Sequence, residues 1–547
     1  MRRRGAGPFA ASLAAAAAGL FVASAMVTMG SAPHGAAAWS LVAPPRGHPL
    51  GSHRGTGLTA TSGVHVAQPE PSASTSLLRT LYPPANATSN GTLAVDEMHT
   101  LYYEIYDESP PGGAQPDSQS RQSKLAALFL HGGPGAGCFP NHARFFDPSR
   151  YRVVLLDQRG CGRSVPRGET AGNTLAHLVE DCEALRLHLQ PSHRWDVVLG
   201  GSWGTTLALA YAQQYSESVG ALVLRGVCLF RPKEIDWLFA RGAAGGAAKM
   251  NPGGWKAFEG AVGIGATGNQ DDDRSSSDDR QSDSDTVHPL VPADRTALHR
   301  YMDCLLSSDP TLRLHAARAW MMWEMSVTKA NQTGFTDGTD SADSEQSSPI
   351  LVWDGARGSW AYQNADGSPA DGCGIPPHER ARSLRRFGPA DDASGTVRSV
   401  RSPHHIDKNS APSMPRSIDP STKDLIELPP PPSNVNAEQT VAAKKFLPAQ
   451  AMLTCFYSAN DRFVMGRYHN SMLDEANVDQ VRNIPCIAIQ GGRDHICPPD
   501  TAMDLAEAWA EMELRICLNG GHSMYDENIT SEIVRATDRL ADAGGRM

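Results

Sequence analysis

The run WDVVLGGSWGTTLALAYAQQ at residues 195–214 constrains the fold of this chain more than any other stretch. Its apolar, β-branched beginning predicts a buried strand, and its later part, rich in alanine and leucine, predicts a helix. Glycines flank Ser202 on both sides, as a sharp strand-to-helix turn requires, because larger side chains do not fit where the backbone folds back on itself. The alternative is an ordinary glycine turn that contains a serine.

Strand-like and helical patterns alternate along the chain. Each predicted strand is a short apolar run, and several of these runs end in a glycine-rich loop. Such alternation predicts a mostly parallel sheet with helices on both faces, which is an α/β fold. The strand-like runs lie at 91–107, 125–135, 151–164, 195–204, 220–229, 484–494 and 514–523, and helical spacing occurs at 174–190 and about 501–511.

A long middle region of different composition separates the two groups of predicted strands. From about residue 231 the chain becomes helical and contains several tryptophans, which predicts a helical cap. Two low-complexity stretches, at about 266–287 and 329–440, are expected to be disordered surface insertions because they bury too little to offset chain entropy. A small buried patch is compatible with residues 350–362. The predicted organisation is a leader at 1–75, core segments at 76–230 and 466–547, and a cap at 231–465.

The formal net charge of −10 comes largely from one segment. Residues 271–285 contain seven aspartates and two arginines, a net of −5 and therefore half of the total. No basic cluster typical of nucleic-acid binding occurs, and the ten cysteines form no C-x-x-C pair that would indicate a metal site. We therefore expect neither nucleic acid nor metal nor cofactor. Cys486 and Cys517 lie in apolar runs and are expected to be buried free thiols.

The N-terminus has the layout of a targeting sequence. Arg2, Arg3 and Arg4 precede an alanine-rich apolar run from Phe9 to Met29, and small residues follow. This pattern predicts a secretory signal, and the Ser-, Gly- and Pro-rich stretch behind it is typical of a transit segment for an organelle such as a plastid. The expected destination is the secretory route or an organelle. An uncleaved membrane anchor is the alternative, because about 20 apolar residues can span a bilayer.

Two further polar residues follow strand-like runs and form an ordered set with Ser202. Asp494 follows CIAIQGGR, and His522 follows LRICLNGG. A serine hydroxyl is a poor nucleophile unless a base, an orienting acid and an oxyanion pocket assist it. The chain order Ser, Asp, His is that of α/β-hydrolases, in which each residue follows a strand. Taken singly, Asp494 has the alternative of a turn former and His522 of a loop residue; taken together, the three predict a catalytic triad.

The segment HGGPG at residues 131–135 supplies the remaining part of such a site. A glycine-rich loop at the end of a strand can turn its backbone N–H groups toward a developing oxyanion. We assign the oxyanion hole to the N–H groups of Gly133 and of Trp203, with Gly132 close by.

Together these motifs resemble those of the proline iminopeptidases, which are α/β-hydrolase aminopeptidases that remove N-terminal proline. The resemblance rests on HGGPG, on DQRGCGRS at 157–164, on GGSWGTT at 200–206 and on WMMWE at 320–324. The matching segments make up about half of the chain and keep the family's order. The resemblance implies an α/β-hydrolase fold with a helical cap and the same triad that the residues themselves predict.

An aminopeptidase must also hold the protonated amine of its substrate, and a buried carboxylate is the natural partner. The resemblance assigns this role to Glu324, whereas a surface salt bridge is the alternative for a glutamate on a helix. The family usually adds a second glutamate in a segment A-R-I-E-x-H-Y-F, which aligns with AMLTCFYSAN at 451–460 and has Thr454 at the glutamate position. Losing a hydrogen bond to a charged group costs about 1.5–3 kcal/mol, so we expect weaker binding of free N-terminal proline or a changed substrate.

The expected function is a serine aminopeptidase that releases N-terminal proline from peptides through an acyl-enzyme on Ser202. An esterase or amidase of the same fold is the first alternative, which Thr454 favours and Glu324 disfavours. A non-catalytic scaffold whose insertions bind a partner is the second alternative. The complete triad argues against it, because a scaffold has no need to retain all three groups.

Overall fold

The computed structural model describes most of the chain outside the leader and the insertions. The predicted leader at 1–75 and the predicted insertion at 266–287 lie outside the described residues. Within the described part, no helix is both long and apolar enough to cross a membrane. The described residues are 78–107, 124–240, 246–264, 296–329, 349–355, 357–364, 368–370, 374–386 and 437–544.

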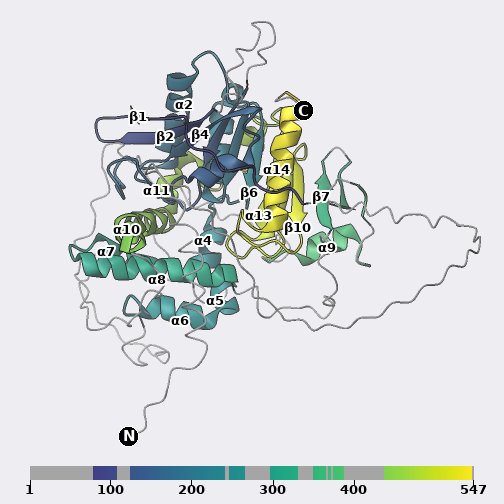
Figure 1. The fold of residues 1–547 in the computed structure, drawn as a ribbon. Helices are drawn as coiled ribbons and strands as arrows, with labels where there is room; N and C mark the ends of the chain where they lie inside the picture. The colour runs from purple at the N-terminus through teal and green to yellow at the C-terminus, as the bar shows by residue number, and fades with distance from the viewer. Residues whose placement is uncertain are drawn as a thin grey trace, which may run out of the picture.

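A single mixed sheet forms the centre of the described structure (Figure 1). Its strand order is β1-β2-β4-β3-β5-β6-β9-β10-β7-β8, and the six strands from β4 to β10 in that order run parallel. The strands at both ends of the sheet pair antiparallel. The strands are β1 (Ser89–Ala94), β2 (Thr100–Tyr106), β3 (Leu125–Leu130), β4 (Tyr151–Asp157), β5 (Val197–Gly201), β6 (Leu222–Arg225), β7 (Ile350–Asp354), β8 (Ser359–Gln363), β9 (Cys486–Gly491) and β10 (Glu513–Cys517).

Helices cover both faces of the sheet, as the continuous apolar strands predict. In β3, Leu128 and Leu130 join the core beneath α2 (Leu175–Leu189) and α3 (Trp203–Gln214), whereas Ala127 and Phe129 join the core beneath α14 (Glu527–Asp542). Neither face of such a strand is exposed to water, and therefore its sequence is apolar throughout. The helix α13 (Pro499–Ala508) contributes to the same core as α2 and α3.

A helical cap lies beside the sheet and is inserted between β6 and β9 (Figure 1). Its centre is an aromatic cluster in which Phe258 stacks on Tyr301 with ring centroids 4.3 Å apart, and Trp320 stacks on Phe239 at 4.8 Å. These rings fix the long helix α8, which carries Glu324. The cap helices are α4 (Pro232–Phe239), α5 (Gly246–Met250), α6 (Pro252–Gly260), α7 (Thr296–Leu306), α8 (Pro310–Lys329), α10 (Ala437–Ala459), α11 (Asp461–Met465) and α12 (Glu475–Val478).

The prediction of a disordered insertion over 329–440 is wrong for one part of it. The strands β7 and β8 form a hairpin that pairs with β10 and so extends the main sheet. The helix α9 (Pro377–Ser383) follows this hairpin. Ile350, Leu351 and Val352 are all buried, because the short apolar run is long enough to complete a sheet edge although its surroundings are polar.

Candidate active site

The parallel strands end at one edge of the sheet, and the predicted catalytic residues gather there. Ser202 directly follows β5, Asp494 lies three residues beyond β9, and His522 lies five residues beyond β10. Because neighbouring parallel strands present their carboxyl ends on the same side, loops that are far apart in the sequence meet at this edge. The structure therefore places all three residues that the sequence predicts as a triad at the same edge of the sheet, with Asp494 and His522 in direct contact.

Ser202 occupies a strained turn between β5 and α3. Its φ of 55° and ψ of −123° lie in a region that side-chain-bearing residues rarely adopt, as a nucleophile elbow requires. The turn is possible only with glycines around it. A Cβ on Gly200 would lie 2.2 Å from the Gly204 carbonyl oxygen, and a Cβ on Gly204 would lie 2.1 Å from the Leu130 carbonyl oxygen.

Replacing Gly204 with alanine is expected to lower the free energy of unfolding by about 3 kcal/mol, because the added methyl group meets backbone that cannot move aside. Gly253 in α6 is a matched control, since a Cβ there meets nothing within 4 Å. Gly253→Ala should leave stability unchanged or raise it by up to about 1 kcal/mol. Denaturation followed by circular dichroism measures both, and equal stability of the two variants would contradict the packing argument.

Asp494 orients His522 through a short hydrogen bond. The Asp494 Oδ2 atom lies 2.8 Å from His522 Nδ1, and its Oδ1 atom accepts the N–H groups of Ile496 at 2.9 Å and Cys497 at 2.8 Å. Since an ionised carboxylate only accepts hydrogen bonds, Nδ1 of the ring carries the proton and Nε2 of the neutral ring remains an acceptor. This is the arrangement that a general base needs.

Arg225, at the end of β6, connects the nucleophile loop with the histidine loop. Its carbonyl oxygen accepts the Ser202 N–H at 2.8 Å, and its Nη1 donates to the His522 carbonyl oxygen at 2.7 Å. The Ser202 hydroxyl lies 4.0 Å from Cys497 Sγ, and among the described contacts it has no hydrogen bond to His522. Catalytic hydrogen bonds often tighten only when substrate binds.

A buried hydrogen-bond network holds the HGGPG loop against the elbow. The Gln158 N–H donates to His131 Nε2 at 3.1 Å, and its side chain joins the His131 carbonyl oxygen to the Trp203 indole at 2.9 and 3.0 Å. A Cβ on Gly132 would lie 3.1 Å from Ser202 Cβ, so this loop passes directly beside the serine. The sequence singled out Gly132, Gly133 and Trp203 but missed Gln158 and Arg225.

The backbone N–H groups predicted for the oxyanion hole are available to donate hydrogen bonds to a substrate. Within the described residues, the N–H groups of Gly132, Gly133 and Trp203 donate to no protein acceptor. Gly133 has a φ of 114°, which glycine adopts without strain, and it lines the pocket together with Ser202. Unpaired N–H groups beside a nucleophile are suitable donors to an oxyanion.

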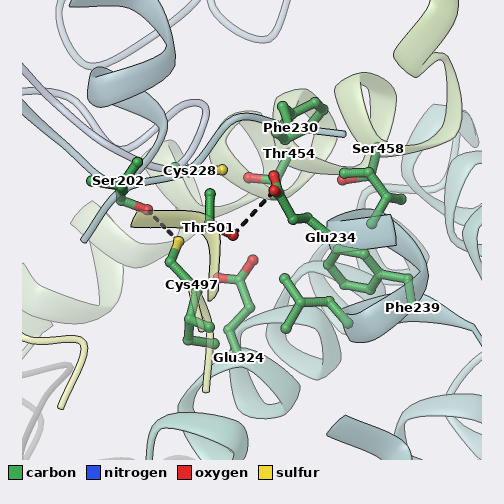
Figure 2. Close-up of a pocket in the computed structure, with 15 residues that line it drawn as sticks. Ser202, Cys228, Phe230, Glu234, Phe239, Glu324, Thr454, Ser458, Cys497 and Thr501 are labelled. Carbon is green, nitrogen blue, oxygen red and sulfur yellow. Dashed lines mark hydrogen bonds between the residues drawn. The ribbon is translucent and has the colours of Figure 1, made fainter. Parts of the chain in front are cut away.

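A pocket lies between Ser202 and the cap (Figure 2). One side consists of apolar residues of α4 and the strand loops, and the rest carries a few polar side chains. The lining residues are Gly133, Ser202, Val227, Cys228, Phe230, Glu234, Ile235, Leu238, Phe239, Glu324, Thr454, Ser458, Ile496, Cys497 and Thr501. A mostly apolar cavity with convergent polar groups is typical of a small-molecule or peptide-end site.

Glu324 presents a carboxylate to this pocket. Its Oε1 accepts the Trp320 indole N–H at 2.8 Å, and it has no ion-pair partner among the described residues. Burial raises the pKa of Glu324 to about 7, against the weaker opposing effect of the Trp320 hydrogen bond. The surface salt bridge that was the alternative for this glutamate is therefore absent from the described residues. A carboxylate held in this way is strongly favoured to take a cation from a ligand.

Thr454 lies in the same pocket, where the sequence alignment expected a second glutamate. Its hydroxyl lies 2.7 Å from the Pro134 carbonyl oxygen and 3.0 Å from the Gln450 carbonyl oxygen. A hydroxyl has one proton, so it donates to one of these carbonyls and keeps lone pairs for a ligand donor. Thr454 thus offers a neutral acceptor instead of a second charge.

Comparison with known proteins defines the class to which this fold and site belong. A family model described as the alpha/beta hydrolase fold matches residues 128–255, and the parallel sheet, the elbow and the inserted cap are those of an α/β-hydrolase. A proline iminopeptidase of Arabidopsis thaliana is 32% identical over 84% of this chain and 82% of its own. One of Xanthomonas citri is 29% identical over 85% of this chain and 100% of its own. The chain belongs to the proline iminopeptidase family of serine hydrolases.

Proposed function

We propose that this chain releases N-terminal proline from peptides through an acyl-enzyme on Ser202. The observation that carries the proposal is one pocket that contains both the elbow serine and the unpaired carboxylate of Glu324. An aminopeptidase needs these two groups together, one to attack the scissile carbonyl and one to bind the free amine. The relatives bearing this name cover most of the chain and support the same activity.

Each chemical step of this proposal is assigned to a group at the sheet edge that can perform it. The Ser202 oxygen attacks the carbonyl carbon of the first residue while its proton passes to His522 Nε2. The N–H groups of Gly133 and Trp203 stabilise the oxyanion, and the protonated His522 then gives its proton to the leaving amine as the C–N bond breaks. A water molecule, deprotonated by His522, next attacks the ester carbonyl, and His522 returns the proton to the Ser202 oxygen as the ester C–O bond breaks and proline is released. Asp494 stays ionised and stabilises the imidazolium throughout.

Glu324→Gln is expected to raise KM for a proline arylamide about tenfold to a hundredfold, because the ammonium loses a charged partner that the other carboxylate among the described lining residues, Glu234, does not replace while it is paired with Arg231. The wild-type KM should rise as the pH falls below about 7, since a protonated Glu324 is neutral and cannot pair with the ammonium. The variant should lose this pH dependence. Steady-state kinetics from pH 5 to 9 measures both, and an unchanged KM would contradict the amine role.

A substrate panel tests the proposed function as a whole. The arylamide of proline, its N-acetylated form and a simple acyl ester should be compared with the same enzyme preparation. Turnover of the free-amine substrate alone is the expected result. Preference for the ester or the acetylated substrate would indicate an esterase or amidase in which Thr454 marks a change of specificity, and would overturn the proposal.

A further inference from the structure

One side chain in the pocket has no role in the proposed reaction. Ser458 lies on α10 four residues after Thr454, so the two residues project from the same face of the helix, and both line the pocket. Ser458 is only 1% exposed. Its Oγ atom is among the buried polar atoms of the described residues that have no hydrogen-bond partner.

The other buried polar side chains of the pocket are satisfied within the protein. The Glu234 carboxylate accepts from the side chain of Arg231 at 2.7 Å and from Thr501 at 3.1 Å, and the Thr454 hydroxyl bonds to the Pro134 carbonyl. Buried polar groups in folded proteins almost always have a partner. An exception inside a binding pocket indicates that the ligand supplies the missing partner.

The position of Ser458 identifies which part of a substrate it meets. Figure 2 shows Ser458 and Ser202 on opposite sides of the pocket, with Phe239 on the side of Ser458. A substrate with its carbonyl at Ser202 and its amine at Glu324 can reach this far side only with the side chain of its first residue. For proline, that part is the ring.

The residue type at position 458 also indicates a polar contact in this part of the pocket. On the alignment that the resemblance implies, this chain has Ser458 at the position of the final phenylalanine of the segment A-R-I-E-x-H-Y-F. Exchanging a phenyl ring for a hydroxymethyl group leaves more space and adds both a donor and an acceptor. A pocket that only had to enclose the apolar proline ring would gain nothing from the hydroxyl.

We propose that Ser458 is a specificity-determining residue that hydrogen-bonds a hydroxyl group on the ring of the N-terminal residue, so that the chain prefers a ring-hydroxylated prolyl substrate over proline. A ring hydroxyl is the smallest substituent that provides both a donor and an acceptor to an unpaired serine. This inference rests on the proposed aminopeptidase function, because it needs the carbonyl at Ser202 and the amine at Glu324.

The test compares kcat/KM for the arylamides of proline, trans-4-hydroxyproline and cis-4-hydroxyproline. The wild-type chain should favour one hydroxylated epimer over proline by at least about tenfold. Ser458→Ala should bring the ratio to about one by lowering kcat/KM for the favoured epimer, and it should fold normally because it removes an unpaired hydroxyl. Ser458→Phe should favour proline over both epimers.

Thr501→Val is the matched control, because it removes a pocket hydroxyl that already has a partner. It should change kcat/KM for all three substrates by the same factor. Equal turnover of proline and both epimers by the wild-type chain would overturn the inference, as would a preference that survives in Ser458→Ala. Both results are distinct from failure of the proposed function, which would show as no turnover of any of the three arylamides.

Discussion

Asp494→Asn is expected to lower kcat by about 10⁴-fold with little change in KM. The carboxylate that accepts the His522 Nδ1–H becomes an amide, whose NH₂ group can donate to Nδ1 and place the ring proton on Nε2. A ring protonated on Nε2 cannot take the proton of Ser202. Asp494 is outside the set of residues that line the pocket, so substrate binding should persist. Steady-state kinetics with a proline arylamide measures the effect.

Asp526→Asn is the matched control for this variant. Asp526 lies four residues after His522, and its carboxylate accepts the Gly521 N–H at 2.7 Å. The oxygen of an asparagine side chain can accept the same N–H. We expect kcat to fall less than about tenfold. Ser202→Ala sets the floor of activity, and combining it with Asp494→Asn should add almost nothing, because triad residues act as a unit. Activity of Asp494→Asn within tenfold of the wild type would remove Asp494 from the mechanism.

Arg225→Met is expected to lower kcat by about 10²-fold while KM changes less than about threefold. Only the guanidinium contact to the His522 carbonyl is lost, because the Ser202 N–H bonds to the backbone of Arg225. The His522 loop then has a buried carbonyl without its donor, which costs about 1–3 kcal/mol and lets the ring leave its reactive position. Burial lowers the pKa of Arg225, and the side chain has no ion-pair partner among the described residues, so keeping this charge buried lowers the free energy of unfolding. We therefore assign Arg225 as a positioning residue.

Arg225→Lys separates positioning from simple destabilisation. A lysine keeps the charge and one donor, so kcat should recover partly, whereas a fold defect would lower the amount of active enzyme in both variants alike. Active-site titration with a serine-directed reagent gives that amount. If kcat per titrated site equals the wild-type value in Arg225→Met, the residue supports the fold and does not position His522.

The sequence was sufficient for those parts of the site that are encoded locally. The elbow around Ser202 and the order of Asp494 and His522 depend on short motifs beside strands, and the strands are predictable because they are buried on both faces. The roles of Gln158, Arg225 and Ser458 depend on which side chains tertiary packing brings near them. Gln158 and Ser458 lie in motifs noted in the sequence and Arg225 only in a strand-like run, and neither a motif nor a strand pattern indicates a contact.

The hairpin at 350–363 was anticipated only as a small buried patch, and its pairing with the main sheet was missed for a different reason. Composition averaged over 329–440 is polar, and the average conceals one short run of apolar residues that pairs with β10, more than 150 positions later.

Glu324 is an intermediate case. The sequence predicted its role from a motif, but the absence of any ion pair among the described residues, and with it the raised pKa, could be seen only in the folded chain.

The same hairpin has a consequence for how the protein behaves in solution. Without β7 and β8, the outer edge of β10 would present unpaired backbone N–H and C=O groups to other molecules, and an uncovered strand edge is a template for intermolecular pairing. The hairpin moves the edge of the sheet to β8, which is a short strand (Ser359–Gln363) whose residues are mostly exposed or half-buried. A shortened chain made by excising 330–436 would therefore carry an aggregation-prone edge, so the insertion also protects the solubility of the enzyme.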